Sequence, residues 1–129
     1  MKEINTTNAP KAVGHYNQAI QVGNIVYCSG QIPIDPATGE LALYNNDAAK
    51  QAALVLKNLA AVLKSAGGSM NDVAKVTIFV ANMDDFAKIN DIYATAFGSH
   101  KPARACVQVA RLPKDVLVEM DAIAHIESL

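Results

Sequence analysis

The sequence predicts a two-layer α+β domain in which two helices cover one face of a mixed sheet of five to six strands. Three observations predict this fold class. A Gly-Asn pair separates two β-rich runs, two longer segments repeat apolar residues at helical spacing, and two C-terminal runs alternate strictly between apolar and polar residues. The 129 residues fit one domain, residues 1–129, without a linker or an internal repeat.

The N-terminal part of the chain predicts strands and turns. Residues 2–5 fit a short edge strand, and residues 12–17 read as an irregular loop. Residues 19–22 and 25–28 flank Gly23-Asn24, which predicts a hairpin because glycine supplies the positive φ of a primed turn. Residues 34–40 contain proline, glycine and aspartate in the pattern of a surface turn.

The middle of the chain predicts two helices around one strand. The first helix begins after Asn46 or Asp47 and ends near residue 66, before Gly67-Gly68. Residues 69–72 resemble a capping-box turn that leads into an alternating strand at 73–80. The second helix spans about 84–97 and places Asn90, a polar residue, on its apolar face.

The two C-terminal runs, 103–109 and 116–126, predict strands joined by a short connection that contains proline. We expect them to pair in antiparallel fashion and to bring Arg104, Cys106 and Glu119 onto one face. A guanidinium, a thiol and a carboxylate on one patch form a candidate site. The helix-free face would also expose Phe79, Leu117 and Ile123, which favours self-association.

Composition and charge narrow the classes of function. Hydrophobic residues make up 51% and charged residues 18%, which indicates a globular chain, and the net charge of -1 gives no reason to expect a polyanionic partner. A local basic cluster remains, formed by Lys101, Arg104, Arg111 and Lys114.

No run reaches transmembrane length, and no signal-peptide pattern opens the sequence. Cys28 and Cys106 lack CxxC spacing, so we expect no disulfide, no zinc site and a cytoplasmic location. HExxH, Walker A and GxGxxG motifs are absent.

Six segments of the sequence form a recognisable set: Pro102-Ala103-Arg104-Ala105-Cys106-Val107, Leu112-Pro113-Lys114-Asp115, Val118-Glu119-Met120, Ala12 to Ala19, Ser29-Gly30-Gln31-Ile32-Pro33 and Ile89 to Tyr93. Together these segments resemble the Rid (YjgF-type) enamine/imine deaminases. The resemblance covers nearly the full length. It implies a chorismate-mutase-like fold, a homotrimer with active sites between subunits, and hydrolysis of 2-aminoacrylate, 2-iminobutanoate and related enamines or imines to 2-keto acids and ammonia. Such a reaction needs water and proton transfers but no metal or organic cofactor.

The chemistry of a substrate with a carboxylate beside an imine carbon assigns roles to the charged residues. Arg104 offers a planar fork that binds a carboxylate with two hydrogen bonds, and Glu119 is the candidate to hold water and relay protons. Backbone groups near Gly30 and Cys106 are expected to support the keto oxygen or the imine nitrogen. By the resemblance, Tyr16, Ser29 and Asn90 complete the pocket.

Structural interpretations compete with these roles. In these interpretations, Arg104 and Glu119 form a cross-strand ion pair, and Cys106 is a buried thiol that does not react. In the structural interpretation, Asn90 is a helix residue that hydrogen-bonds a neighbouring loop, Tyr16 is a core aromatic residue, and Ser29 is a polar residue at a strand end. We expect His100 and His125 to be solvated. His15 and Asn17 replace a proline and a serine that the family usually has, which leaves the preorganisation of the Tyr16 loop open.

A second class of function remains open as well, because the family has been linked to RNA cleavage and to chaperone-like binding. RNA cleavage would use the basic cluster, and the near-neutral net charge argues against it. A chaperone would need the apolar sheet face to stay uncovered, whereas a trimer would cover it.

Overall fold

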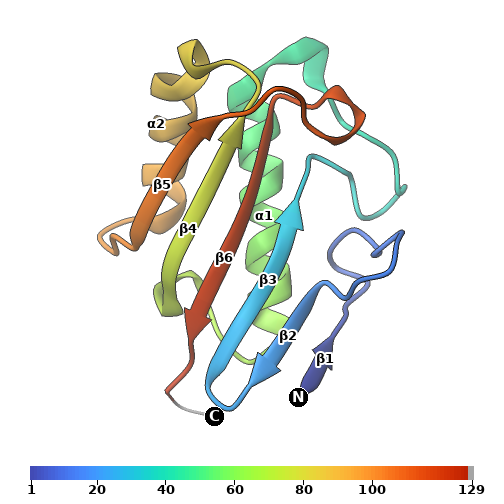
Figure 1. Cartoon of the computed structure of the whole chain (residues 1–129), viewed down its shortest axis with the longest axis vertical. Coiled ribbons are helices and arrows are strands. Elements are labelled where there is room, and N and C mark those ends of the chain that lie inside the picture. The colour runs from blue at the N-terminus through green and yellow to red at the C-terminus, as the bar shows by residue number, and fades with distance from the viewer. Residues whose placement is uncertain (128–129) are drawn as a thin grey trace.

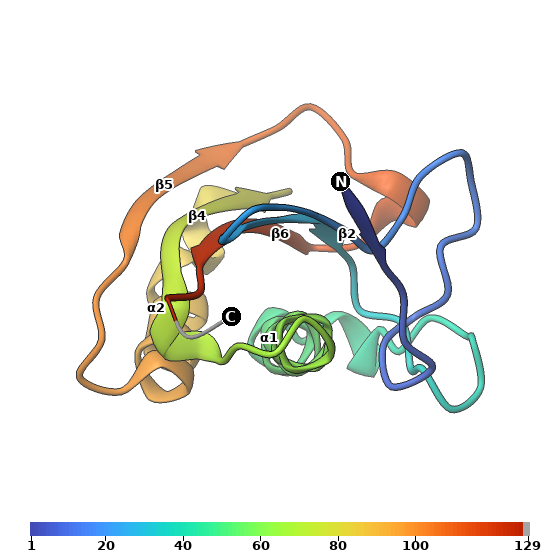
Figure 2. The ribbon, with the colours of Figure 1, turned by 90° about the horizontal axis from the view of Figure 1, so that it is seen from below.

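A computed structural model describes residues 1–127 as one sheet of six strands with two long helices. The elements are β1 (Lys2–Ile4), β2 (Ala19–Val22), β3 (Ile25–Gln31), α1 (Ala48–Ser65), β4 (Val73–Val80), α2 (Phe86–Phe97), β5 (Ala103–Gln108) and β6 (Val118–His125). Both helices lie on the same side of the curved sheet (Figures 1 and 2). The predicted two-layer α+β architecture with a mixed sheet is therefore confirmed.

The predicted turns and caps are also confirmed. Gly23 has a φ of 57° in the β2–β3 hairpin, and Gly67 has a φ of 89° after α1. The Asp47 side chain caps α1 by accepting a hydrogen bond from the Lys50 amide, and Ser69 begins a capping box. The second helix begins at Phe86 rather than near residue 84, because a 3₁₀ turn at Met83–Asp85 precedes it.

The strand order is β1-β2-β3-β6-β4-β5, and the predicted pairing of the last two strands is wrong. β5 pairs in parallel with β4, and β6 lies between β3 and β4, antiparallel to both. The reason is topological: α2 carries the chain from the end of β4 back to its start, so that β5 enters beside β4 in the same direction. Local alternation identifies a strand and its faces but contains no information about its partner.

The register also places the candidate residues on different faces, contrary to the prediction. Arg104 and Cys106 pair with Val76 and Ile78, whose side chains are buried on the helix side of the sheet. Glu119 pairs with Phe79 and lies on the opposite, helix-free face. The expected common face of Arg104, Cys106 and Glu119 therefore does not exist within one chain.

The helix-free face carries exposed apolar side chains, as predicted for Ile123, whereas Phe79 is only partly exposed. Tyr27 and Ile123 are cross-strand neighbours with exposed fractions of 49% and 38%, and Val107 is 43% exposed. Leu117 differs from expectation because it is partly buried and packs against the core, where its backbone N–H donates to Gln51 Oε1 at 2.9 Å. Among residues 1–127, no helix has both the length and the apolar character required to cross a membrane.

Candidate functional site

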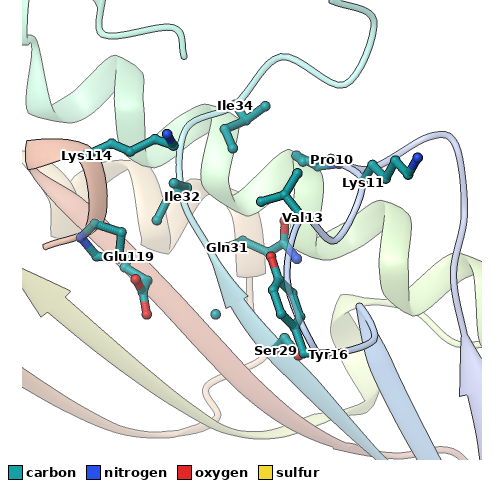
Figure 3. Close-up of a pocket in the computed structure, with 12 residues that line it drawn as sticks. Pro10, Lys11, Val13, Tyr16, Ser29, Gln31, Ile32, Ile34, Lys114 and Glu119 are labelled. Atoms are coloured by element: carbon teal, nitrogen blue, oxygen red, sulfur yellow. The ribbon is translucent and has the colours of Figure 1, made fainter. Parts of the chain in front are cut away.

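Four of the predicted site residues line one cleft at the end of β3. The cleft has a volume of about 460 Å³, and Glu119 and Tyr16 lie on opposite sides of it (Figure 3). Ser29 and Gly30 lie at its floor, and an apolar part extends beyond them. The lining residues are Pro10, Lys11, Val13, Tyr16, Ser29, Gly30, Gln31, Ile32, Ile34, Pro113, Lys114 and Glu119.

The loop that carries Tyr16 has no regular secondary structure, and the buried side chain of Gln18 organises it. Gln18 Nε2 donates to the carbonyl oxygens of Thr6, Ala9 and Pro10 at 3.0, 3.3 and 2.8 Å, and its Oε1 accepts from the Thr6 amide at 2.7 Å. One side chain thus satisfies four backbone groups that have no partner in a helix or sheet. The resulting loop presents Tyr16 with about half of its surface exposed, so Tyr16 is not the core aromatic of the structural alternative.

The two residues in which this chain departs from the usual family pattern occupy different environments. The Asn17 side chain accepts a hydrogen bond from Asn5 Nδ2 at 2.9 Å, which ties the loop to the N-terminal segment. His15 is exposed and does not line the cleft.

A β-bulge in β3 shapes the floor of the cleft. Between the Cys28–Ala122 and Gln31–Met120 pairs, β3 contains one residue more than β6, and the extra residue falls at Ser29-Gly30. The Ser29 hydroxyl donates to the Asn17 carbonyl oxygen at 2.6 Å, so it anchors the Tyr16 loop. A Cβ atom added at Gly30 would lie 2.5 Å from Glu119 Oε2, so the carboxyl group can keep its present position only beside a glycine.

The environment of Glu119 favours the protonated carboxyl. Partial burial raises the pKa of Glu119, and the negative charge of Asp121 on the same face of β6 raises it further. Burial also raises the pKa of Asp121, against the effect of hydrogen bonds from Thr77. A carboxyl group with a raised pKa is suited to proton transfer near neutral pH.

Arg104 lies on the edge strand β5, where residues of α2 surround its side chain. Arg104 Nη1 donates to Asn90 Oδ1 at 2.6 Å, and its Cζ lies 4.9 Å from the Tyr93 ring centroid and 5.3 Å from that of Phe86. Within residues 1–127, no carboxylate forms an ion pair with Arg104. Arg104, Asn90 and Tyr93 line a second cleft of about 390 Å³, and the positive charge there has no neutralising partner among these residues.

Cys106 follows Arg104 by two residues and points to the same side of the sheet, where it packs against the core. Burial raises the pKa of the Cys106 thiol, and the nearby Arg104 lowers it only in part. Burial likewise raises the pKa of Cys28, to about 12, with a contribution from Asp121. Both thiols are therefore protonated at neutral pH, and Cys106 fits the structural alternative of an unreactive thiol.

The predicted site is thus divided into two half-sites. The acid half-site consists of Tyr16, Ser29, Gly30 and Glu119, and the arginine half-site consists of Asn90, Arg104 and Cys106. Because β4 separates β5 from β6 and Glu119 stands level with Val107, the half-sites lie about 10 Å apart across the sheet and about 10 Å along it, on opposite faces. An ion pair between Arg104 and Glu119 of one chain is excluded.

Sequence reasoning missed several residues of the half-sites. Phe86 and Tyr93 appear in the sequence as core positions of α2, and only their spacing with Asn90 indicates a shared face. The alternation of 116–126 already places Asp121 on the same face as Glu119, but the sequence does not show that Asp121 raises the pKa of Glu119. His100 was expected to be solvated, but its Nε2 lies 2.7 Å from the Val73 carbonyl oxygen. Arg111, a member of the predicted basic cluster, forms an ion pair with Asp115 at 2.7 Å. Residues 1–127 contain no group of three or more His, Cys, Asp and Glu side chains placed to hold a metal.

Comparison with known proteins identifies the family. Residues 6–126 match the family described as Endoribonuclease L-PSP. The RutC family protein PH0854 of Pyrococcus horikoshii is 55% identical over 98% of this chain and 100% of its own length. The 2-iminobutanoate/2-iminopropanoate deaminase of Escherichia coli is 47% identical over 95% of this chain and 96% of its own. The crystal structure of Escherichia coli TdcF with bound serine superposes with a TM-score of 0.91 at 46% identity, over 97% of this chain and 98% of that one.

The chain belongs to the YjgF/Rid family. The family resemblance predicted from the sequence is therefore confirmed. Both half-sites lie within the part of the chain that matches the YjgF/Rid family, and the sheet with its two helices is the fold of this family's solved structures.

Proposed function

We infer that this protein hydrolyses short 2-imino acids and their enamine tautomers, such as 2-iminobutanoate and 2-aminoacrylate, to 2-keto acids and ammonia. The observation that carries this proposal is an unneutralised guanidinium, held by Asn90, together with a carboxyl group whose pKa is raised. The name of the relative from Escherichia coli supports the reaction, and the serine bound to TdcF supports a small ligand with a carboxylate.

The separation of the half-sites argues for sites shared between copies of the chain. A 2-imino acid carries its carboxylate directly on the imine carbon, so groups that bind both must come within a few ångströms of one another. Within one chain the two half-sites are too far apart and face opposite sides. A homotrimer whose subunits contact one another head to tail would place the arginine half-site of one subunit against the acid half-site of the next.

The exposed apolar side chains of the helix-free face support such an assembly. Tyr27, Val107 and Ile123 form part of a surface that no helix covers, and burial of apolar area is the main driving force of association. The cleft residue Val13 is also 77% exposed. Contact with a neighbouring subunit would cover these side chains.

In the proposed reaction, Arg104 binds the substrate carboxylate with two hydrogen bonds and so orients the imine carbon. Glu119 accepts a proton from water as the water oxygen bonds to that carbon, and it returns this proton to the imine nitrogen, giving a carbinolamine. Transfer of the carbinolamine hydroxyl proton to nitrogen, again through Glu119, breaks the C–N bond as the C=O bond forms, which releases ammonia and leaves the 2-keto acid. One water is consumed and no electrons are exchanged. Ser29 and Tyr16 shape the cleft, Gly30 leaves room for the Glu119 carboxyl, and Cys106 lines the arginine half-site through its backbone.

The test is a direct measurement of hydrolysis. An amino acid oxidase acting on 2-aminobutyrate produces 2-iminobutanoate in place, and the formation of 2-ketobutyrate is followed with and without the protein. We expect a large acceleration that Arg104→Ala abolishes. An unchanged rate of keto-acid formation would contradict the proposal.

RNA cleavage is the alternative, and the same preparation tests it. The description of the family as an endoribonuclease keeps this alternative open. The basic cluster is weaker than its sequence indicates, because Asp115 pairs with Arg111 through hydrogen bonds of 2.7 and 3.0 Å. RNA cleavage that declines steeply with salt, in the absence of imine hydrolysis, would favour the alternative.

A further inference from the structure

Three residues of α2 form a cradle around the Arg104 guanidinium. Phe86, Asn90 and Tyr93 are spaced by four and three residues, so their side chains lie on one face of the helix. The amide oxygen of Asn90 accepts a hydrogen bond from Nη1 at 2.6 Å. The rings of Tyr93 and Phe86 lie 4.9 and 5.3 Å from Cζ, within the range of cation–π attraction.

The position of Arg104 explains why such a cradle is needed. β5 is an edge strand, and Arg104 is exposed. An exposed arginine has many rotamers, and ordering it costs conformational entropy on every binding event unless it is ordered in advance. A neighbouring carboxylate would order the side chain but would also occupy the donors that a substrate needs. A neutral amide and two aromatic rings order it without neutralising its charge.

The cradle uses only a small part of the guanidinium. Arginine has five N–H donors, and Asn90 is its one side-chain hydrogen-bond acceptor within residues 1–127. The Tyr93 hydroxyl is buried and makes no hydrogen bond within the same residues, so the ring rather than the hydroxyl contacts Arg104. The remaining N–H groups are left to bind a planar anion.

We propose that Phe86, Asn90 and Tyr93 are positioning residues that hold the Arg104 guanidinium in the orientation required to bind the substrate carboxylate with two hydrogen bonds. This proposal rests on the proposed function, because it takes Arg104 as the carboxylate-binding group. It replaces the substrate contact that the sequence predicts for Asn90 with a contact to Arg104.

The experiment compares two ligands that differ only in the carboxylate. Pyruvate and pyruvamide are titrated into the assembled protein by calorimetry, and KM and kcat are measured for 2-iminobutanoate. The variants are Asn90→Ala, Asn90→Asp, Tyr93→Leu and Tyr93→Phe. Thr95→Ala is the control, because Thr95 lies on the same helix and its hydroxyl, within residues 1–127, bonds only to the Asp91 carbonyl oxygen. Thermal unfolding and light scattering verify the fold and the assembly of each variant.

We expect Asn90→Ala and Tyr93→Leu to weaken pyruvate binding by roughly tenfold, as loss of a hydrogen bond or an aromatic contact to a charged group predicts. Binding of pyruvamide should not change, and KM should rise more than kcat falls. Asn90→Asp should weaken pyruvate binding more than Asn90→Ala, because the new carboxylate competes for the guanidinium. Tyr93→Phe, which keeps the ring, should lose less pyruvate affinity than Tyr93→Leu, and Thr95→Ala should behave like the unmodified protein.

Two results would overturn the cradle. One is unchanged pyruvate affinity in both Asn90→Ala and Asn90→Asp. These two variants test the cradle even if Tyr93→Leu does not fold. The other is an equal loss of pyruvate and pyruvamide affinity, which would indicate a general structural role. The variant Arg104→Ala separates the two proposals. If Arg104→Ala binds pyruvate as tightly as the unmodified protein, the proposed function is contradicted. If Arg104→Ala loses pyruvate affinity while the Asn90 and Tyr93 variants keep it, only the cradle is contradicted.

Discussion

At the scale of single residues, the two charged groups of the candidate site are in opposite electrostatic situations. Arg104 is exposed and has no carboxylate partner within residues 1–127, so its full charge is available to an anion. Glu119 is partly buried beside the like charge of Asp121, which raises its pKa. The first situation suits binding of an anionic ligand, and the second suits proton transfer.

Replacement of Arg104 by lysine tests the geometry of carboxylate binding. We expect Arg104→Lys to lose nearly all turnover of imines that carry a carboxylate, because an ammonium group is a point charge and cannot form the two-pronged contact. The fold should persist, since the side chain is exposed on an edge strand. Measurement of kcat/KM together with circular dichroism distinguishes the two effects. Wild-type activity in this variant would contradict bidentate binding.

Replacement of Glu119 by glutamine removes its proton transfer but keeps its shape. Product binding should persist while kcat falls by roughly a hundred- to ten-thousand-fold, the usual contribution of general acid–base catalysis. The measurement pairs kcat with the affinity for 2-ketobutyrate. If the variant bound no keto acid, Glu119 would be a scaffold residue instead.

The pH dependence of activity follows from the direction of the Glu119 pKa shift. If ionised Glu119 is the base, activity is lost as the pH falls through its pKa, and burial with Asp121 moves that loss above the usual glutamate value of 4.5. In Asp121→Asn one of the two causes is absent, so the pKa falls and the acid limb of the kcat/KM profile should move to lower pH. The acid limb should still lie at a higher pH than an ordinary glutamate would give, because burial continues to raise the pKa of Glu119. A limb that does not move would exclude coupling between the two carboxyl groups.

At the scale of elements, polar side chains buried in α1 fasten the loops around the site. Gln51 Nε2 donates to the Leu43 carbonyl oxygen at 2.9 Å, and its Oε1 accepts from the Leu117 amide just before β6. Asn58 Nδ2 donates to the Ile34 carbonyl oxygen at 2.9 Å, on the wall of the acid half-site cleft. The helix therefore positions the site in addition to covering the sheet.

The β-bulge in β3 gives a prediction at the same scale. In Gly30→Ala, the new Cβ would lie 2.5 Å from Glu119 Oε2 and 3.0 Å from its Cδ, so the carboxyl group must move. A misplacement of about 1 Å costs activity by roughly a hundredfold. The double variant Gly30→Ala/Glu119→Gln should lose little more than Glu119→Gln alone, because both changes act on one group. Fully additive losses would mean that Gly30 acts independently of Glu119.

Local patterns in the sequence predicted the elements well because the physics that forms them is local. The Gly23-Asn24 turn, the Asp47 cap and the Ser69 capping box each depend on a few neighbouring residues. Pairing of β5 depends on where α2 returns the chain, which no local pattern encodes. The face on which Arg104 lies depends on the register of β5 against β4, which alternation within β5 does not encode either. Alternation in the two C-terminal runs had already indicated Arg104, Cys106 and Glu119, and the family resemblance added Tyr16, Ser29 and Asn90, but the grouping of these residues into half-sites required the structure.

At the scale of the whole molecule, the half-sites on opposite faces predict complementation between inactive chains. Arg104→Ala and Glu119→Gln chains, unfolded and refolded together, should regain activity, with about one quarter of the sites in a randomly mixed closed ring pairing two intact halves. Arg104→Ala mixed with Asn90→Ala is the matched control and should show no more than the residual activity of the Asn90→Ala chains, because both changes damage the same half-site. Light scattering reports the size of the assembly. Full activity from a monomer would contradict shared sites.

The central place of β6 has a consequence for the order in which a growing chain can fold on the ribosome. β6 lies between β3 and β4, yet of the six strands of this sheet it is the last to be synthesised. Until residues 118–125 leave the exit tunnel, the strand that joins the β1–β3 part of the sheet to the β4–β5 part is missing. Val26 and Val76, which are fully buried in the finished sheet, therefore lack their β6 neighbours Ala124 and Ala122 until this last strand has been made. A stop codon shortly before β6 should yield an aggregating fragment, since the loss falls at the centre of the sheet rather than at its edge.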